Sequence, residues 1–413
     1  MDRKAYRTIE IADSEGVRTF VVCGMPSVGK TTLVLNYIKK TYEEFLYIDA
    51  RFDFAFRSFF SEYTGRGDKL SLIDFFSEYF KISQEYLVNI PIILDEPSEV
   101  FLKSGMFKEY MQELKLFIIE CDRNRVSFLK KVVKGDLTIC EIKLFPMNFG
   151  EFLIALDKEW YDEVISGHIM SKRRIPDMIH EELSDLFEIF CFTGGMPEVV
   201  EEFIKFGSTE NIRQKQEKTA ASVVYPLLKA SSQLPADSEI VPYKIEAILE
   251  AVEDILKKEN HKFMYSSIRD GATKRQYEPA MDHLCANDIV FKVCSLSKDD
   301  YRAYLSDIGL YRGEIGKRSL ESLVLQEIRS SGLDVKYWES GKGASVSMIV
   351  EGTSGLVPIE LKQEKSNIRS VKAFLKESGA SYYLRFTEEN IKAEHDYISV
   401  PFYAAYTIDK LLK

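Results

Sequence analysis

The stretch of sequence that decides the fold is Gly24-Met25-Pro26-Ser27-Val28-Gly29-Lys30-Thr31. It matches the phosphate-binding pattern G-x-x-x-x-G-K-[ST] in full. Glycines let backbone N–H groups turn toward phosphate oxygens, the lysine reaches the terminal phosphates, and the final hydroxyl can hold Mg²⁺. The nucleotide-binding residues predicted from this pattern are Gly24, Pro26, Ser27, Val28, Gly29, Lys30, Thr31 and the following Thr32.

The residues on either side of the loop support this interpretation over a chance match in an irregular segment. Thr19 to Cys23 is a short apolar run rich in β-branched residues, which is typical of a buried strand. Thr32 to Ile38 continues with apolar residues at helical spacing. A strand, a phosphate-binding loop and a helix therefore follow one another.

Length and charge bound the class of protein. A chain of 413 residues exceeds what one core usually holds, so two to four domains are expected. The formal net charge of −10 argues against a protein that coats nucleic acid or anionic membrane by bulk electrostatics. Any such partner must be met by a local basic patch.

The cysteines and the apolar runs indicate the cellular compartment in which the protein is expected. The six cysteines lack C-x-x-C spacing and nearby histidines, so we predict buried free thiols in a reducing environment. The N-terminus has no apolar signal core, and no run approaches the roughly 20 apolar residues of a membrane span. A cytoplasmic protein without a membrane partner is the simplest expectation.

The pattern of apolar runs predicts an α/β fold. Short apolar runs alternate with amphipathic stretches over the first 150 or so residues, which favours a parallel sheet with both faces covered by helices. The pattern of predicted elements then changes. A mostly helical stretch comes first, residues 245–293 follow with three helices and a strand in that order, and a small α/β unit comes last. The predicted domains are a P-loop core (1–155), a helical lid and connector (156–240), a winged helix (241–312) and a nuclease-like unit (313–413).

Two carboxylates end a second buried strand. Pro91 to Glu96 reads as four apolar residues followed by Asp95 and Glu96, and buried carboxylates are costly unless a cation or donors satisfy them. We predict that Asp95 holds Mg²⁺ together with Thr31, and that Glu96 orients the attacking water. Asp49 ends another predicted strand at the same sheet edge, where it is either a site residue or a helix cap or turn residue.

An ordered set of motifs carries a family resemblance. The motifs are Gly24–Thr32, Leu94–Glu96, Leu144–Leu153, Gly194–Val200, Lys258–Tyr265, Tyr304–Leu310 and Pro358–Lys362. In this order the chain resembles prokaryotic AAA-family P-loop ATPases that carry a winged helix and a C-terminal PD-(D/E)xK nuclease-like domain of unknown function. The resemblance implies ATP with Mg²⁺, and it implies that Gly195 and Pro197 contact the nucleotide from the lid, the alternative being a helix-breaking turn.

The chain also departs from that family. Phe117 to Asn124 replaces a small Gly-Ser type turn that can sense the γ-phosphate, and Asp136 stands after Gly135 where an arginine is common. Arg123 and Arg125 are the substitutes the sequence offers. Because such an arginine is worth about 10³ to 10⁵ in rate, we expect slow hydrolysis that serves as a conformational switch.

The predicted winged helix and nuclease-like unit leave partners open. Lys274 and Arg275 would begin the helix that meets DNA in helix-turn-helix proteins, but such domains also dock proteins, so DNA, a protein partner and homo-oligomerisation are all alternatives.

The nuclease-like unit carries part of a metal site. Alternation places Glu360 and Lys362 on one strand face, as a metal-dependent nuclease needs. Ser347 stands where that family has an aspartate, and serine lacks the charge that holds a hard cation. A degenerate or binding-only domain is therefore favoured.

The motifs, together with this resemblance, predict an ATP-binding protein of the AAA type. Two alternatives remain open at this point. One is a nucleotide-regulated, metal-dependent DNA nuclease centred on Glu360 and Lys362, and the other is a non-catalytic, nucleotide-gated module that binds DNA or protein.

Overall fold

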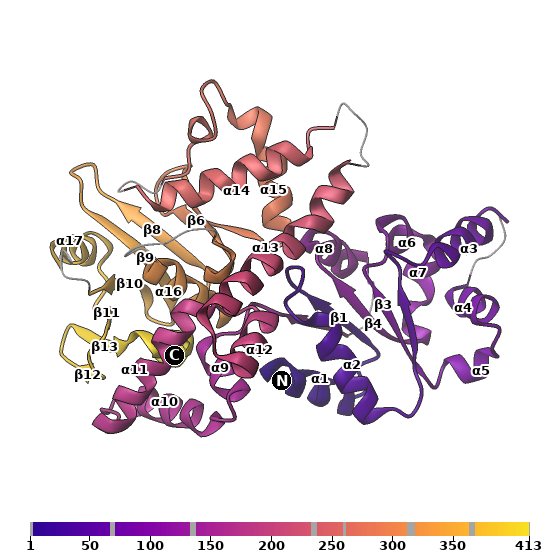
Figure 1. The fold of residues 1–413 in the computed structure, drawn as a ribbon, viewed down its shortest axis with the longest axis horizontal. Helices are drawn as coiled ribbons and strands as arrows, with labels where there is room; N and C mark the ends of the chain where they lie inside the picture. Colours follow the sequence, from indigo (N-terminus) through magenta and orange to yellow (C-terminus); the bar gives the residue numbers. More distant parts are fainter. Residues whose placement is uncertain are drawn as a thin grey trace. The chain divides into compact units, whose positions relative to one another are not determined.

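The computed structural model describes residues 3–66, 71–132, 138–232, 238–258, 262–311, 319–362 and 368–412. The chain divides into an N-terminal unit (residues 2–144 and 286–288) and a C-terminal unit (residues 145–285 and 289–413). Figure 1 labels their helices and strands. None of the described helices combines the length and the apolar character that crossing a membrane requires.

The N-terminal unit is built on a five-stranded parallel sheet in the order β2-β3-β4-β1-β5. Its strands are β1 (Thr19–Cys23), β2 (Leu46–Asp49), β3 (Pro91–Asp95), β4 (Lys115–Glu120) and β5 (Ile139–Lys143). These positions confirm the predicted parallel α/β fold of this part of the chain. Because all five strands run the same way, their carboxyl ends meet at one edge of the sheet.

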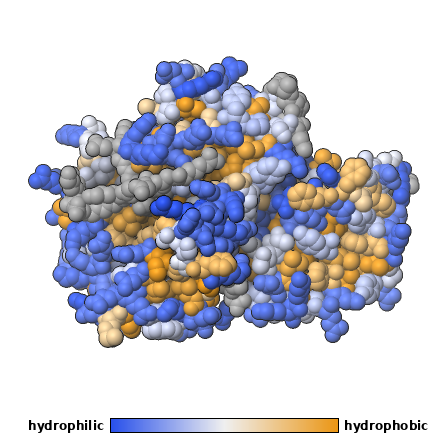
Figure 2. Space-filling view, viewed as in Figure 1, coloured by the Kyte–Doolittle hydropathy of each residue, from blue (hydrophilic) through white to orange (hydrophobic). Residues whose placement is uncertain are grey.

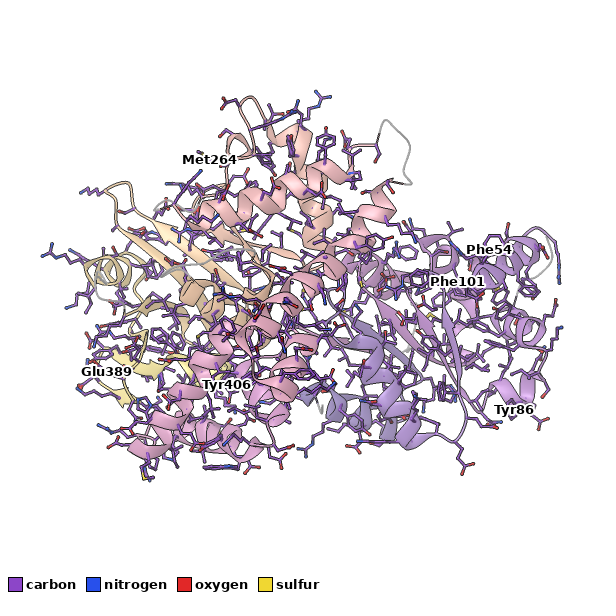
Figure 3. All side chains as sticks on the ribbon, viewed as in Figure 1. Phe54, Tyr86, Phe101, Met264, Glu389 and Tyr406 are labelled. Carbon is purple, nitrogen blue, oxygen red and sulfur yellow. The ribbon has the colours of Figure 1, made fainter. Side chains whose placement is uncertain are left out.

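Helices cover the sheet on both faces, as the uninterrupted apolar strands require. They are α1 (Lys4–Ser14), α2 (Lys30–Thr41), α3 (Phe54–Thr64), α4 (Leu72–Phe80), α5 (Gln84–Leu87), α6 (Glu99–Lys103), α7 (Gly105–Tyr110) and α8 (Arg123–Val132), with the 3₁₀ turn η1 (Met111–Glu113). On one face Phe20 of β1 stacks on Phe117 of β4 at 4.5 Å between ring centroids. On the other face, Val21 shares a core with aromatic residues of α3, α4 and α6, among them Phe101 (Figure 3).

Some large apolar side chains of this unit are exposed. Phe52, Phe54 and Val100 each expose about seven tenths of their surface. Figure 2 shows apolar areas among hydrophilic ones on the viewed face. Single exposed apolar residues are normal on protein surfaces, so they indicate no site by themselves.

The C-terminal unit begins with helices and continues into a mixed eight-stranded sheet in the order β12-β13-β11-β10-β9-β8-β6-β7. Its helices are α9 (Phe149–Ala155), α10 (Glu159–Ser171), α11 (Asp177–Thr193), α12 (Pro197–Phe206), α13 (Thr209–Ser232), α14 (Pro242–Leu256), α15 (Lys274–Ala286), α16 (Ser319–Ser330) and α17 (Ile368–Ser378), with the 3₁₀ turns η2 (Tyr265–Ser267), η3 (Ile308–Leu310) and η4 (Phe402–Lys410). Its strands are β6 (Val290–Ser295), β7 (Tyr301–Leu305), β8 (Val335–Glu339), β9 (Ser345–Gly352), β10 (Gly355–Leu361), β11 (Tyr383–Thr387), β12 (Lys392–Ala393) and β13 (Tyr397–Pro401).

The chain end forms part of the core of this unit. Tyr406 of η4 is buried, and its hydroxyl donates a hydrogen bond to Asp162 of α10 at 2.6 Å (Figure 3). A Cβ on Gly150 of α9 would lie 2.7 Å from the Tyr406 ring, so only glycine allows this close approach. Segments of α9, α10 and η4 are therefore packed as one body.

The segment predicted to be a winged helix differs from the expected three helices. Between α14 and α15, the described residues 257–258 and 262–273 contain the 3₁₀ turn η2 in place of the expected middle helix. Ser266 and Ser267 are poor helix formers, and Gly271 with φ +76° breaks the backbone soon after. Strands β6 and β7 of this segment join β8 in one sheet. The domain boundaries at 155, 240 and 312 stay predictions.

The prediction of buried thiols is only partly correct. Cys23 and Cys121 are buried and all six cysteines are free, but Cys294 is exposed on β6. Composition could not foresee this, because the exposure of a residue on a strand depends on what covers that face.

Candidate functional site

The predicted phosphate-binding loop connects β1 to α2. Gly29 caps α2 in the left-handed conformation with φ +94°. Gly24 has φ +147°, and a Cβ at this position would lie 2.2 Å from the carbonyl oxygen of Leu144. Both glycines are thus required by backbone geometry, one by its dihedral angles and the other also by a neighbouring chain segment. The loop amides at the N-terminus of α2 suit an anionic ligand.

Lys30 is the buried cation of the loop. Its Nζ donates to the carbonyl oxygens of Gly24 at 2.9 Å and Met25 at 3.0 Å, and it lies 2.9 Å from Sγ of Cys121. Glu96 Oε1 is 3.9 Å away. Lys30 is thus held at the mouth of the loop, close to the two residues that follow β3 and β4.

Asp95 and Thr31 meet as the two motifs predict. The Thr31 hydroxyl donates to Asp95 Oδ2 at 2.7 Å, and the Tyr47 hydroxyl donates to the same oxygen at 3.0 Å. Burial raises the pKa of Asp95, against the hydrogen bond from Thr31 and the charge of Arg51. A hydroxyl beside a buried carboxylate is a hard-oxygen donor pair of the kind that Mg²⁺ prefers, so these residues fit the ion.

Glu96 follows directly in a strained backbone conformation. Its φ is +53°, which is unusual for a residue with a side chain, and its N–H donates to the Ile119 carbonyl at 2.9 Å. The Cys121 thiol donates to Glu96 Oε1 at 2.5 Å. Burial, and then the charge of Glu96, raise the pKa of the Cys121 thiol, so Cys121 remains a proton donor.

A second carboxyl lies behind Glu96. Glu120 is completely buried at the end of β4, and its Oε1 accepts from the N–H groups of Cys121 and Asp122, each at 3.0 Å. Burial, followed by the charge of Glu96, raises the pKa of Glu120 well above its usual range. Arg125 Nη1 lies 3.4 Å from Glu120 Oε2 and opposes that shift.

The turn after β2 adds a cation that the sequence interpretation missed. Arg51 Nη2 lies 3.9 Å from Asp95 Oδ1, and its Nε lies 3.4 Å from Asp49 Oδ1. Asp49 itself pairs in register with Asp95, which confirms its position at the predicted sheet edge. Tyr47, Arg51, Glu120 and Cys121 could have been found by inspecting the carboxyl end of every predicted strand.

The arginines proposed as substitutes are both paired with carboxylates of the N-terminal unit. Arg125 donates to the Pro97 carbonyl at 3.3 Å in addition to its pair with Glu120. Arg123 pairs with Asp288 at 3.3 Å. The substitution at Asp136 lies outside the described residues.

Gly195 and Pro197, predicted to contact the nucleotide, belong to the C-terminal unit. The Gly195 N–H donates to Asp307 Oδ2 at 2.7 Å, and its carbonyl accepts from the Met147 N–H at 2.7 Å. A Cβ on Gly194 would lie 2.5 Å from Asp307 Oδ1. A Cβ on Gly195 would lie 2.1 Å from the Met147 carbonyl oxygen, so close packing explains both glycines, and Pro197 begins α12. Their contact with nucleotide stays a prediction.

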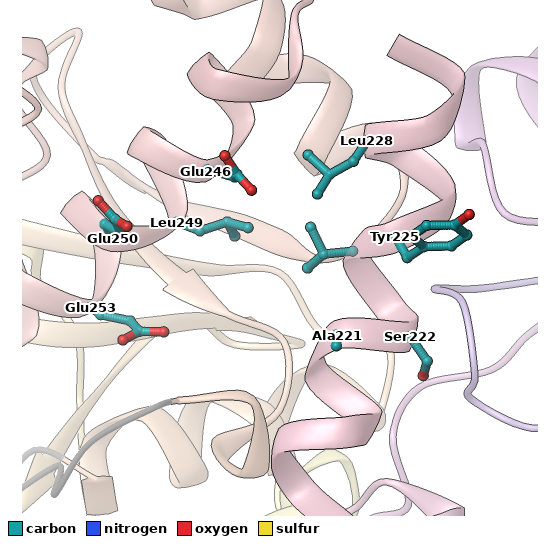
Figure 4. A pocket seen from close by; sticks show the side chains of 9 residues that line it. Ala221, Ser222, Tyr225, Leu228, Glu246, Leu249, Glu250 and Glu253 are labelled. Atoms are coloured by element: carbon teal, nitrogen blue, oxygen red, sulfur yellow. The ribbon is translucent and has the colours of Figure 1, made fainter. Parts of the chain in front are cut away.

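The helices predicted to face a partner carry acidic as well as basic groups. Lys274 of α15 pairs with Glu278 at 3.4 Å. A cavity of about 600 Å³ lies between α13 and α14, where Glu246, Glu250 and Glu253 face an apolar wall that includes Tyr225 and Leu228 (Figure 4). This cavity is electrostatically unsuited to a nucleic acid backbone. DNA binding through Lys274 and Arg275 stays a prediction.

Each residue considered for the predicted nuclease site has a charged partner within the C-terminal unit. Arg385 Nε donates to Glu360 Oε2 at 2.8 Å, and Lys362 forms an ion pair with Glu389, which Figure 3 labels. Ser347 accepts from Arg302 Nη1 at 3.2 Å. Within the described ranges, no three His, Cys, Asp or Glu residues lie close enough together to hold a metal ion.

Neither a model of a known protein family nor a curated protein matches the sequence. Several solved structures are similar, among them the following three. The Walker-type ATPase of Pyrococcus abyssi is 14% identical with a TM-score of 0.45, over 75% of this chain and 94% of the other. A Signal Transduction ATPase with Numerous Domains protein of Pyrococcus horikoshii is 13% identical with a TM-score of 0.30, over 80% and 45% of the two chains. Cdc6p of Pyrobaculum aerophilum is 12% identical with a TM-score of 0.26, over 78% and 92%. Because every TM-score is below 0.5, these likenesses do not establish a common fold for the whole chain.

Proposed function

We propose that the protein binds ATP with Mg²⁺ at the β1–α2 loop and hydrolyses it slowly, as a conformational switch. The observation that carries this proposal is the 2.7 Å hydrogen bond between Thr31 and Asp95. It joins the hydroxyl of the loop to the carboxylate of another strand, residues that are 64 positions apart in the chain. Two motifs that were recognised separately thus lie in contact, which supports a single shared site.

Each residue has a distinct role in this proposal. Lys30 and the loop amides bind the phosphates, while Thr31 and Asp95 hold Mg²⁺. Bound there, Mg²⁺ would neutralise negative charge on the phosphates. Glu96 orients and activates the attacking water, and Cys121 fixes the direction of its carboxylate by donating to Oε1. Preference for ATP over GTP follows from the family resemblance, since no guanine-reading N/T-K-x-D motif is evident in the sequence.

The alternative of a metal-dependent nuclease is less well supported. Arg385 places a fixed positive charge 2.8 Å from Glu360, where a nuclease needs its metal ion. Arg302 likewise contacts Ser347, at the position expected to carry the missing aspartate. The C-terminal unit is therefore better suited to a structural or binding role, and a protein partner or a second copy of the chain remains part of the proposal.

Two variants test the proposed function. Lys30→Ala should abolish ATP binding measured by calorimetry, because the loop loses its only long cation. Glu96→Gln should keep ATP binding and lose phosphate release, by roughly 10² to 10⁴-fold as expected for removal of a general base.

The results distinguish three functions: a slow ATPase, a nucleotide-gated binding module and a metal-dependent nuclease. Absence of ATP binding by the wild-type protein would refute the proposal. If the wild-type protein binds ATP but releases phosphate no faster than Glu96→Gln does, the protein is a nucleotide-gated binding module without catalysis. Mg²⁺-dependent DNA cleavage that is lost in Glu360→Ala would restore the nuclease alternative.

A further inference from the structure

We propose that Arg51 is a catalytic residue that contacts the terminal phosphate of ATP and stabilises the negative charge that develops there during hydrolysis. The inference rests on the proposed function and adds to it the identity of the arginine. It places the cation in the same chain as the phosphate-binding loop. A second subunit is then not needed to supply it.

The position of Arg51 supports this role. It follows β2, the strand next to β3 in the sheet, so its side chain reaches the same carboxyl edge as Asp95 and Glu96. Nη2 lies 3.9 Å from Asp95 Oδ1. Since Asp95 also accepts from Thr31, the guanidinium is next to the proposed Mg²⁺ ligands, where the terminal phosphate is expected.

The partners of the neighbouring arginines favour Arg51. Arg125 is bound to Glu120 and to the Pro97 carbonyl, and Arg123 is bound to Asp288. Removing Arg125 from Glu120 would leave a buried carboxyl without its cation, which is costly. Arg51 is 39% exposed, its described partners are two carboxylates at 3.4 and 3.9 Å and the Phe52 ring at 5.5 Å, and water can replace these long contacts when the guanidinium moves.

Charge explains how Arg51 would change partner. Asp95 attracts the guanidinium while its carboxylate charge is uncompensated. A divalent cation held by Asp95 would neutralise that charge, and the guanidinium would then be attracted to the terminal phosphate. An arginine fork can donate two parallel hydrogen bonds to phosphate oxygens, which a lysine cannot do. The same movement would couple nucleotide binding to the turn that follows β2.

The test compares Arg51→Ala and Arg51→Lys with Arg57→Ala. Arg57 is a matched control because it is exposed on α3, carries the same charge and has the Phe54 ring, at 6.0 Å, as its described contact. Calorimetry with ADP, with the non-hydrolysable analogue AMP-PNP and with ADP plus aluminium fluoride gives a readout that does not depend on turnover. Thermal unfolding verifies that each variant is folded.

We expect Arg51→Ala to bind ADP as the wild type does. It should bind AMP-PNP about tenfold more weakly, as loss of a charge-assisted hydrogen bond implies, and lose the tight aluminium fluoride complex. Phosphate release should fall by roughly 10³-fold. Arg51→Lys should recover part of the AMP-PNP affinity, because the charge but not the fork is restored.

Other outcomes overturn the inference. If Arg51→Ala behaves as Arg57→Ala does, Arg51 has no role at the phosphate. If it weakens ADP and AMP-PNP equally, Arg51 only maintains the loop or Asp95. If the wild-type protein binds no nucleotide, the proposed function fails, and the role of Arg51 fails with it. The first two results, by contrast, would overturn only the role of Arg51, because the wild-type protein would still bind ATP.

Discussion

At the scale of single residues, the site depends on how Glu96 is held. Its backbone is in the left-handed region, which costs free energy for a residue with a side chain, and the structure compensates with a hydrogen bond to the Ile119 carbonyl. The Cys121 thiol then fixes Oε1. A weak neutral donor is sufficient here because burial of the pair strengthens the interaction.

A substitution of Cys121 tests this positioning role. Cys121→Ala should lower kcat by about 10 to 100-fold with little change in ATP affinity, since a buried hydrogen bond to a charged group is worth about 1.5 to 3 kcal/mol. Cys121→Ser should retain most of the activity because the hydroxyl also donates. Steady-state kinetics would separate kcat from KM, and an equal loss in both variants would indicate a packing defect instead.

At the scale of elements, the connection of β1 to α2 depends on the contact between Gly24 and the segment after β5. The Leu144 N–H donates to the Cys23 carbonyl at 2.7 Å, so the two segments run close together beside the loop. A side chain at position 24 would collide with the Leu144 carbonyl. Element geometry, and not only the motif, therefore requires this glycine.

Gly24→Ala is expected to remove nucleotide binding and to lower the melting temperature. The added Cβ needs a shift of backbone atoms at 2.2 Å and meets a dihedral angle that side chains rarely adopt. The matched control is Gly105→Ala in the same unit, where nothing lies within 4 Å of the added Cβ. Calorimetry and thermal unfolding check both variants, and equal behaviour would contradict the steric argument.

At the scale of the whole molecule, buried polar residues join distant parts of the C-terminal unit. Asp307 accepts from the N–H groups of Gly195 and Gly309 and from Gln326 Nε2. Burial outweighs these hydrogen bonds and raises the pKa of Asp307 to about 6. One carboxyl thus connects the turn before α12, the η3 turn and α16.

The stability of this unit should therefore depend on pH in a defined direction. An unfolded aspartate has a pKa of about 3.9, so between pH 4 and 6 the folded state keeps a proton that the unfolded state has lost. The contribution of Asp307 is fully present below pH 4 and is lost as pH rises through about 6, by about 3 kcal/mol in total.

Urea unfolding at pH 4.5, 5.5 and 7 measures this contribution. The difference in unfolding free energy between the wild type and Asp307→Asn should change in favour of the wild type as the pH falls. The comparison with the variant cancels the carboxylates that both proteins share. A difference that is constant with pH would show that Asp307 does not titrate in this range.

More of the structure could be predicted from the sequence in the N-terminal unit than in the C-terminal unit. The strands of the parallel sheet and the Thr31 to Asp95 arrangement followed from short local patterns, since uninterrupted apolar runs and a glycine-rich loop constrain their own backbone. The middle helix of the predicted winged helix and the burial of Cys294 were wrong. The first difference reflects local residues, since Ser266, Ser267 and Gly271 disfavour a helix, whereas the exposure of Cys294 depends on what covers that face of β6.

By itself, the sequence determined the position of the Gly24–Thr31 loop between a strand and a helix, the strand that ends in Asp95 with Glu96 directly after it, and the parallel α/β character of the N-terminal unit. Their chemistry resides in consecutive residues, so local order is sufficient. The ends of the predicted strands offer Arg51, Cys121 and Glu120 as candidates, but only the tertiary structure decided that they lie beside Asp95 and Glu96, because strand order brings them together. It likewise decided that Arg125 faces Glu120 and that Arg385 faces Glu360, since the direction of a long side chain is set by the charges around it.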